Sequence, residues 1–456
     1  MRAMKPWVHV GTLDVPCRLV TRRSTSAGKL IGLNSLEALW THVGIIEKEA
    51  KKPIRPMTVQ KLMQTNSYGD TALVKSAEWV REELIVRFAH RIQDFHRLPF
   101  VALANPFVMD TYKVYLETFE NLHKRKKITT RDEERDFSEF LSEWRPRHDR
   151  TVDYMGQGVR QLRAVAPDVG GHMNWFLERF FYFRISRRVM VDHLMARKDP
   201  KAGWRGSIQL SCNPALILKS RAEAVKESCR NSYGLAPPFH LHGNLDVTFA
   251  YFPDHLSLIC TELLKNAMRA TVEMYTMGNS MVPSNTIVTD ESDLPAVTAE
   301  IHKGRTEVVI KIADKGGGIP PRNLENVWNY GYSTVDDSHK KMAERGGSLT
   351  GANTTIGADM AGYGFGLPLS RAFARFFGGD IHIQSHFGVG TDVYLTVSHI
   401  GDEAEALAAV ASAPTQIQEH FPRTHTPNHH NHSHHPTGNS HGSDFGGSEG
   451  YTTWPG

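Results

Sequence analysis

The segment 259–270 carries an acid, an amide and a cation at spacings that could do chemistry. In a helix, positions i, i+4 and i+7 share one face, so Glu262, Asn266 and Arg269 would line up beside an apolar stripe. Such a polar set is costly to hold near a core unless a ligand needs it. A solvated polar face is the alternative, and this helix alone does not decide between the two.

A second group of candidate residues lies where a predicted strand ends. Residues 308–312 alternate with period 2, and Asp314 keeps the same parity directly before a glycine turn. A carboxylate at this position can accept a hydrogen bond from an exocyclic amine such as that of adenine. Gly316 and Gly318 would let a ring approach the backbone closely. An ordinary glycine turn is the alternative reading.

A second glycine run opens another predicted helix. It reads Gly362-Tyr363-Gly364-Phe365-Gly366-Leu367, and the proline that follows suits a first helical turn. Exposed N–H groups at a glycine-rich helix start form an anion site, so the run predicts a contact with phosphate. Beyond this helix, two strand patterns enclose a turn that contains Gly388, Gly390 and Thr391.

Taken in order, these segments resemble the nucleotide-binding motifs of the GHKL superfamily, which includes gyrase, Hsp90, histidine kinases and MutL. Residues 262–269 match its N box, 314–318 its G1 box, 362–366 its G2 box, and 388–391 its last glycine–threonine element. Two segments resemble one branch more closely than the others, the mitochondrial α-ketoacid dehydrogenase kinases. These segments are E-L-L-K-N-A-M-R-A-T-V-E and G-Y-G-F-G-L-P-L-S-R-A. This branch contains the pyruvate dehydrogenase kinases and the branched-chain ketoacid dehydrogenase kinase. The resemblance covers roughly residues 52 to 400.

The resemblance implies a role for each matching residue. Glu262 would be catalytic, orienting or deprotonating an acceptor serine hydroxyl, and Asn266 would ligate the Mg²⁺ that bridges the phosphates of ATP. Asp314 would read the adenine amine, while Lys265 and Arg269 are placed near the phosphates by analogy alone. The implied nucleotide-binding set is Glu262, Lys265, Asn266, Arg269, Asp314, Gly316, Gly318, Ser333, Thr334, Gly362, Tyr363, Gly364, Phe365, Gly366, Leu367 and Thr391. Phosphoryl transfer asks a protein mainly for position and charge neutralisation, which such residues can supply.

One position departs from part of the family. Many pyruvate dehydrogenase kinases carry a histidine four residues before the N-box glutamate, where this chain has Leu258. Leucine cannot hydrogen-bond Glu262, so the glutamate acts without that helper or another group supplies it. The branched-chain kinase also lacks the histidine, and a few short segments of this chain resemble that kinase slightly more closely. The identity of the target complex stays open.

The expected architecture is an α+β protein of two domains with additional segments at both ends. Residues 1–30, rich in Arg and Lys with one acid, match a mitochondrial transit peptide, and a disordered basic arm is the alternative. Residues 31–205 are expected to form an antiparallel four-helix bundle that docks a lipoyl domain. Residues 206–402 would be a GHKL (Bergerat-type) α/β sandwich with a mobile ATP lid at 335–361. Residues 403–456 form a histidine-rich tail, in which 403–410 are expected to form one short helix and the polar chain from about 413 onward is expected to be disordered.

Composition excludes some classes of function. The formal net charge of +4 is small for 456 residues and does not favour nucleic acid as a partner. No apolar run approaches the ~20 residues of a membrane span. The four cysteines are scattered, which fits a reduced compartment and plain packing roles.

These patterns favour an ATP-dependent protein-serine kinase of the mitochondrial matrix. It would phosphorylate and inactivate the decarboxylase component of a pyruvate or branched-chain dehydrogenase complex, with the lipoyl domain of the core as its docking partner and a homodimer as its assembly. One alternative is a protein-histidine kinase of two-component type that uses His90, although no acidic residue follows this histidine directly. The other alternative is an ATP-sensing scaffold that transfers no phosphate.

Overall fold

The protein is described by a computed structural model that covers residues 42–64, 69–166, 168–169, 173–276, 288, 290–332 and 364–407. Some of the predictions above fall on other residues. The arm at 1–30, the lid at 335–361 and the tail from 408 onward lie outside the described residues. So do four of the predicted site residues, Ser333, Thr334, Gly362 and Tyr363.

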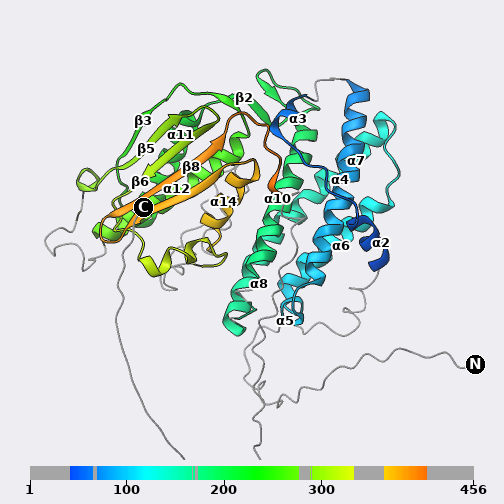
Figure 1. Ribbon diagram of the computed structural model, residues 1–456, viewed down its shortest axis with the longest axis horizontal. Coiled ribbons are helices and arrows are strands. Elements are labelled where there is room, and N and C mark those ends of the chain that lie inside the picture. The colour runs from blue at the N-terminus through cyan, green and yellow to red at the C-terminus, as the bar shows by residue number, and fades with distance from the viewer. Residues whose placement is uncertain are drawn as a thin grey trace, which may run out of the picture. The chain divides into compact units, whose positions relative to one another are not determined.

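Helices form the N-terminal part of the described chain. They are α2 (Val43–Ala50), α3 (Val59–Gln64), α4 (Asp70–His96), α5 (Phe100–Leu103), α6 (Pro106–Lys124), α7 (Arg131–Asp149), α8 (Thr151–Val165) and α10 (Asn174–Ala196). α4 packs against α2, α6, α7 and α10, and α8 packs against α6 and α7 (Figure 1). The prediction of a helical N-terminal region is confirmed.

Capping residues in the sequence set the start of two of these helices. The side chain of Asn105 accepts hydrogen bonds from two backbone N–H groups in the first turn of α6, and Pro106 occupies the first helical position. α7 begins with a capping box in which the side chains of Thr130 and Glu133 each bond the other's backbone N–H. The long helices that carry the apolar core of this region therefore begin at defined residues.

Two sheets follow the helices. The small sheet has the order β1-β2-β4, with β1 (Trp204–Arg205), β2 (Ile208–Cys212) and β4 (Phe249–Tyr251). The main sheet has the order β3-β5-β6-β8-β7, with β3 (Phe239–Gly243), β5 (Val297–Lys303), β6 (Glu307–Ala313), β7 (Asp380–His386) and β8 (Gly390–Ser398). β3 and β5 are parallel and the other neighbours are antiparallel. β1 and β2 pair as an antiparallel hairpin on either side of residue 206, where the second domain is predicted to begin.

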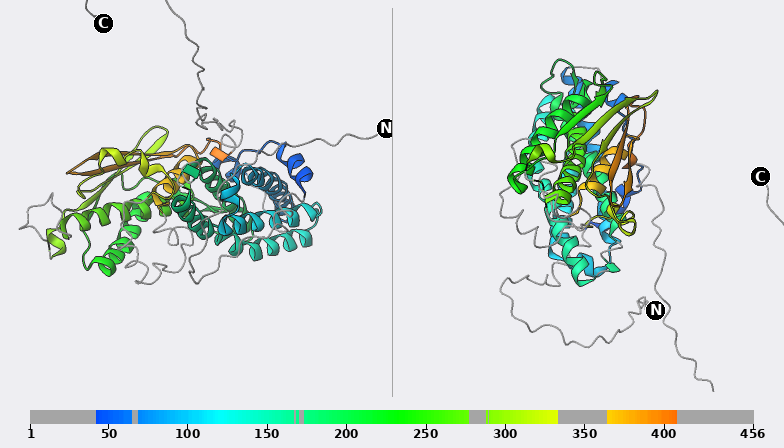
Figure 2. Two further views of the ribbon diagram at one scale, coloured as in Figure 1. Left: turned by 90° about the horizontal axis from the view of Figure 1, so that it is seen from below. Right: turned by 90° about the vertical axis from the view of Figure 1, so that its left-hand side faces the viewer.

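Helices of the described residues pack on one face of the main sheet, as Figure 2 shows. They are α11 (Pro214–Tyr233), α12 (Pro253–Thr276) and α14 (Gly366–Phe376). α11 contacts β3, α12 contacts β5 and β6, and α14 contacts β7 and β8. The part of this region that the structure describes also contains short 3₁₀ turns, namely η2 (Glu291–Asp293), η3 (Pro321–Asn323) and η4 (Asn326–Trp328). A helical region followed by an α/β sheet region is thus the observed order.

Buried and partly exposed residues alternate along β6, as the sequence predicts for a strand. Val308, Ile310 and Ile312 are buried, and they pair with Val397, Leu395 and Val393 of β8. A period of 2 puts these side chains on the helix-covered face and their neighbours on the other face. The predicted strand is therefore confirmed. Within the described ranges, no helix combines the length and apolar character needed to cross a bilayer.

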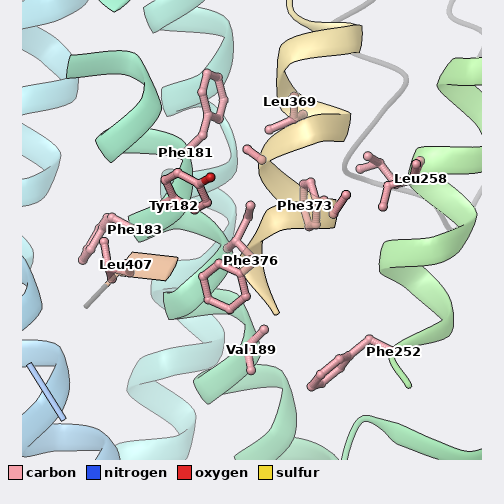
Figure 3. Close-up of a cluster of buried hydrophobic side chains, with 14 of the residues drawn as sticks. Phe181, Tyr182, Phe183, Val189, Phe252, Leu258, Leu369, Phe373, Phe376 and Leu407 are labelled. Carbon is pink, nitrogen blue, oxygen red and sulfur yellow. The ribbon is translucent and has the colours of Figure 1, made fainter. Parts of the chain in front are cut away.

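The helical and sheet regions share an apolar core where α10 meets α14. Tyr182 and Phe376 stack with ring centroids 6.4 Å apart and an angle of 25° between the rings. Figure 3 shows the α14 side chains Leu369, Phe373 and Phe376 between α10 and α12. Aromatic contacts of this kind add to the free energy gained from burial alone. The position of α14 consequently depends on α10 as well as on the sheet.

The first residues of the tail, 403–407, lie within the described part of the chain, and residues 406–407 are helical inside the short helix predicted at 403–410. Glu405 is 1% exposed, accepts a hydrogen bond from the backbone N–H of Met57 at 3.1 Å and pairs with Arg87 of α4. Leu407 is also buried. Composition is an average over the whole tail, so it does not reveal that one carboxylate and one leucine at the start of the tail are buried.

Candidate functional site

The long helix α12 carries the first four predicted site residues. Glu262 is 7% exposed, whereas Asn266, one turn later, is exposed. Lys265 donates from Nζ to Oε1 of Glu262 at 2.9 Å. Arg269 approaches Glu273, with 3.7 Å between Nε and Oε1. The helix is confirmed, and a buried carboxylate with one lysine partner lies beside an exposed amide.

The carboxylate of Glu262 lies against the start of α14. A Cβ added at Gly366 would stand 2.5 Å from Oε2 of Glu262, so the carboxylate keeps its present position only while this residue is glycine. Gly366 is the first residue of α14, where backbone N–H groups lack helical partners. The helix N-terminus and Lys265 both create positive potential around this carboxylate. An anionic ligand would meet the same potential.

Asp314 follows β6 and is held by its own backbone surroundings. Oδ1 accepts hydrogen bonds from the N–H groups of Gly316 at 2.8 Å and Thr391 at 3.3 Å. Oδ2 accepts no hydrogen bond from any described residue, so one oxygen is left for a ligand. Burial raises the pKa of Asp314 to about 6, and the two backbone hydrogen bonds act in the opposite direction. The side chain is 8% exposed, so a ligand that reaches Oδ2 must enter a recess.

The first glycine turn fits between α12 and the β7–β8 hairpin. A Cβ on Gly316 would stand 2.5 Å from the Cβ of Ala270 in α12. Gly318 has φ of +70°, and a Cβ there would stand 2.3 Å from the carbonyl oxygen of His386. Glycine is required at both positions because backbone or a Cβ already fills the space that a side chain would need. The turn therefore brings Asp314 beside the C-terminal half of α12.

The two ends of the candidate site lie along one helix. Glu262 marks one end, and Ala270, against which Gly316 packs, marks the other. Eight residues of α-helix correspond to about 12 Å of rise. The carboxylate of Asp314 and the anion-favouring start of α14 thus lie near opposite ends of this stretch of α12. This arrangement can hold an elongated ligand with a heterocyclic amine at one end and negative charge at the other.

The second glycine run closes on the residues that precede Ser333. Gly364 has φ of +72°, and a Cβ there would stand 2.3 Å from the carbonyl oxygen of Tyr332. The N–H of Gly331 donates to the carbonyl of Gly364 at 3.0 Å. Phe365 is fully buried and Leu367 is half-buried. The described part of the second glycine run therefore contacts the segment that leads to two predicted nucleotide-binding residues.

The group that accompanies Glu262 was not identified from the sequence. Leu258 is buried, and in Figure 3 it lies across from the side chains of α14. His255 stacks on Phe252, with ring centroids 4.9 Å apart, and burial lowers its pKa to about 3. Lys265 is the partner that Glu262 does have. The i, i+3 spacing of these two residues on one helix is the sequence signal for this ion pair, whereas the family resemblance placed Lys265 near the phosphates.

His90, the residue of the histidine-kinase alternative, lies in α4 of the helical region. Its Nε2 is 2.9 Å from the carbonyl oxygen of Lys52, and burial lowers its pKa. No group of three or more His, Cys, Asp or Glu in the described ranges is arranged to hold a metal ion.

Comparisons with known proteins find two family matches, one mostly in the helical region and one in the sheet region. The profile of the family described as mitochondrial branched-chain alpha-ketoacid dehydrogenase kinase matches residues 56–209. The profile described as histidine kinase-, DNA gyrase B- and HSP90-like ATPase matches residues 252–399. The second match spans all the described site residues, from Glu262 to Thr391.

Named relatives are similar to this chain over most of its length. The mitochondrial pyruvate dehydrogenase (acetyl-transferring) kinase of Arabidopsis thaliana is 32% identical over 338 residues, which cover 74% of this chain and 87% of the relative. Isozyme 3 of the human mitochondrial kinase is 30% identical over 378 residues, with 79% and 86% covered. The Drosophila melanogaster mitochondrial kinase is 29% identical over 373 residues, with 78% and 84% covered.

Proposed function

The chain belongs to the family of mitochondrial α-ketoacid dehydrogenase kinases, and we propose that it is an ATP-dependent protein-serine kinase that phosphorylates the decarboxylase component of an α-ketoacid dehydrogenase complex. Phosphorylation would inactivate that complex. The proposed compartment is the mitochondrial matrix, since the similar proteins are named as mitochondrial kinases and residues 1–30 resemble a transit peptide.

One observation carries this proposal. Oδ2 of Asp314 is open to a ligand at one end of α12, and the carboxylate of Glu262 meets the N-terminus of α14 at the other end. Adenine offers an amine to the first group, and phosphates suit the helix start near the second. The acceptor hydroxyl would then approach from the side of Glu262.

Each residue has a separate task in the proposed reaction. Glu262 accepts the proton of the serine hydroxyl, and Lys265 keeps the carboxylate in place through its hydrogen bond to Oε1. Asp314 fixes the adenine, so the phosphate that is transferred reaches the α14 end of the site. The backbone of Gly364–Leu367 supplies N–H groups to the phosphates. Ser333, Thr334, Gly362 and Tyr363 remain predicted contacts of the nucleotide.

The residues present fit a magnesium ion. Mg²⁺ prefers oxygen ligands, keeps several waters and needs few protein groups. Asn266 offers an exposed carboxamide oxygen one turn after Glu262, and no carboxylate pair is required. We assign Asn266 as the ligand, with the bound ion neutralising the charge of the phosphates.

The experiment is phosphate transfer from radiolabelled ATP to purified pyruvate and branched-chain dehydrogenase complexes. We expect acid-stable phosphoserine on the decarboxylase component of one complex. Glu262→Gln should lower the rate by about 10²- to 10⁴-fold and leave nucleotide affinity unchanged. Asp314→Ala should instead weaken nucleotide binding. If Glu262→Gln transferred phosphate at the wild-type rate, Glu262 would not be the general base. Acid-labile phosphate on the protein that disappears in His90→Ala would favour the histidine-kinase alternative. Docking without any transfer would favour the scaffold.

We further propose that the helical region forms a four-helix bundle and docks the lipoyl domain of the complex core. A cavity of about 660 Å³ lies between α3, α4 and α10, and its walls include Met57, Trp79, Val80 and Met190. This volume and its apolar walls suit a long, largely apolar prosthetic arm. Ala72→Trp, which fills the cavity, should abolish binding of an isolated lipoyl domain, whereas Ala104→Trp at an exposed site should not. Equal binding by both variants would exclude this cavity.

The assembly proposed is a homodimer. The described helices α11, α12 and α14 cover one face of the main sheet, and no helix of the described residues packs on the opposite face, which we propose contacts a second copy of the chain. Light scattering on the purified protein should give twice the mass of one chain. A single-chain mass at micromolar concentration would refute the dimer.

A further inference from the structure

Three aromatic rings meet where α10 faces the nucleotide region. Phe181 of α10 stacks on Tyr330, with centroids 5.1 Å apart and 19° between the rings. Phe181 also meets Phe365 edge to face at 5.5 Å and 73°, and Tyr330 meets Phe365 at 5.8 Å and 75°. All three side chains are buried, with exposures of 0% for Phe181 and Phe365 and 5% for Tyr330.

Two of these rings sit next to the proposed phosphate end of the site. Phe365 directly precedes Gly366, against which the carboxylate of Glu262 lies. Tyr330 directly precedes Gly331, whose N–H donates to the carbonyl of Gly364. A shift of either ring therefore moves the backbone that carries the second glycine run.

The helical region holds the same segment at two more points. Arg163 of α8 donates a hydrogen bond from Nη2 to the backbone carbonyl oxygen of Tyr330. Asn174, the first residue of α10, donates from Nδ2 to Oδ1 of Asn329 at 2.8 Å. These contacts fix the backbone at 329–330 while Phe181 fixes the ring of Tyr330.

We propose that Phe181 is a positioning residue for the kinase site, an inference that rests on the proposed function. Through Phe365 and Tyr330 it holds the N-terminus of α14 against Glu262, although Phe181 itself belongs to the helical region. Two of the three rings it contacts lie in the nucleotide region, and the third is its neighbour Phe180. Removing the ring should loosen the phosphate end of the site and leave the adenine end intact.

Phe183 provides a matched control on the same helix. It is 1% exposed, and its ring contacts Phe88 at 4.9 Å and Tyr115 at 5.5 Å, both within the helical region. Phe181→Leu and Phe183→Leu thus remove the same atoms from equally buried sites. Only the first change touches the segments beside Glu262.

The test measures KM for ATP, kcat and the unfolding midpoint of both variants in the full-length protein. An aromatic pair is worth about 0.5–1.5 kcal/mol, and ~1.4 kcal/mol corresponds to tenfold, so Phe181→Leu should raise KM for ATP by about 2- to 12-fold. Phe183→Leu should lower the unfolding midpoint similarly but keep the wild-type KM. A purely structural loss reduces the active fraction, and hence the apparent kcat, at unchanged KM.

A second variant covers the case in which Phe181→Leu does not fold. Tyr330→Leu removes the same ring contact from the other side and should raise KM to a similar extent, and the double variant should be no worse than either single variant. Equal KM values for Phe181→Leu, Phe183→Leu and Tyr330→Leu would overturn the positioning role while leaving the kinase assignment intact. Absence of transfer by the wild-type protein would instead count against the proposed function.

Discussion

Glu405 and Arg87 form a buried bidentate ion pair across 318 residues of sequence. The guanidinium of Arg87 donates from Nη1 to Oε2 at 2.9 Å and from Nη2 to Oε1 at 2.6 Å. Arg87 also donates to Glu83 one turn earlier in α4, at 3.1 Å. The pair fastens the chain that leaves β8 to the helical region, and it accounts for the order of residues 403–407.

Removing one partner of this pair should destabilise the fold strongly. Glu405→Ala leaves the Arg87 guanidinium buried with one carboxylate fewer, a change that costs about 3–5 kcal/mol in comparable pairs. The bidentate pair of Arg147 and Glu117 is exposed and offers a matched control. Glu117→Ala should cost no more than about 1 kcal/mol. Urea denaturation measures both changes, and equal losses would show that burial of the first pair is unimportant.

Asp314 should give nucleotide binding and stability opposite dependences on pH. Burial raises its pKa from 3.8 to about 6, so the folded protein holds a proton that the unfolded chain has lost between these values. Its contribution to stability is complete below about pH 4 and is lost as pH rises through 6. Nucleotide binding needs the ionised carboxylate and should therefore strengthen as pH rises through 6. Calorimetric titration of a nucleotide and urea denaturation from pH 4 to 8 would record both trends.

The variant Asp314→Asn separates these effects. Its amide would place a donor where Oδ2 faces the adenine amine, so nucleotide affinity should fall at every pH. Its stability at pH 7 should equal or exceed that of the wild type, because no buried charge remains. If the variant kept the pH dependence of the wild type near pH 6, another group would be the one that titrates.

Gly366→Ala should slow phosphate transfer without unfolding the protein. The added Cβ would stand 2.5 Å from Oε2 of Glu262, and the end of that flexible side chain would move away. A displacement of about 1 Å at a reacting group can cost about 100-fold in rate. Helix propensity favours alanine over glycine, so the unfolding midpoint should hold or rise.

Gly44→Ala in α2 is the control for this substitution. Nothing lies within 4 Å of a Cβ built there, so rate and stability should both stay near wild type. Transfer kinetics measure the rates of the two variants, and thermal unfolding measures their stabilities. An unchanged rate for Gly366→Ala would mean that the contact between Gly366 and Glu262 does not matter for transfer.

Gly318→Ala should cost more stability than Gly388→Ala. Both glycines have positive φ, +70° and +87°, so alanine is strained by about 1–2 kcal/mol at either position. The space around them differs, because a Cβ on Gly318 would stand 2.3 Å from the His386 carbonyl oxygen and a Cβ on Gly388 meets nothing within 4 Å. The difference between the two unfolding free energies therefore reports the steric clash. Equal losses would mean that the first glycine turn can move away from the hairpin.

The sequence by itself determined the elements and the order of the motifs. The period of 2 in β6, the polar face of α12 and the proline after the second glycine run are local features. Local features are readable because periodicity and backbone conformation depend on neighbouring residues only. Gly318 and Gly364 could be singled out for the same reason, since positive φ is a property of one residue.

Only the tertiary structure decided which atoms meet. It pairs Lys265 with Glu262, leaves Oδ2 of Asp314 open, and brings Phe181 from the helical region to Tyr330. It also gives Glu405 a buried partner, which the composition of the tail does not reveal. These contacts join residues far apart in the chain or select one oxygen of a carboxylate. They follow from how whole helices and strands pack, and no local pattern encodes that packing.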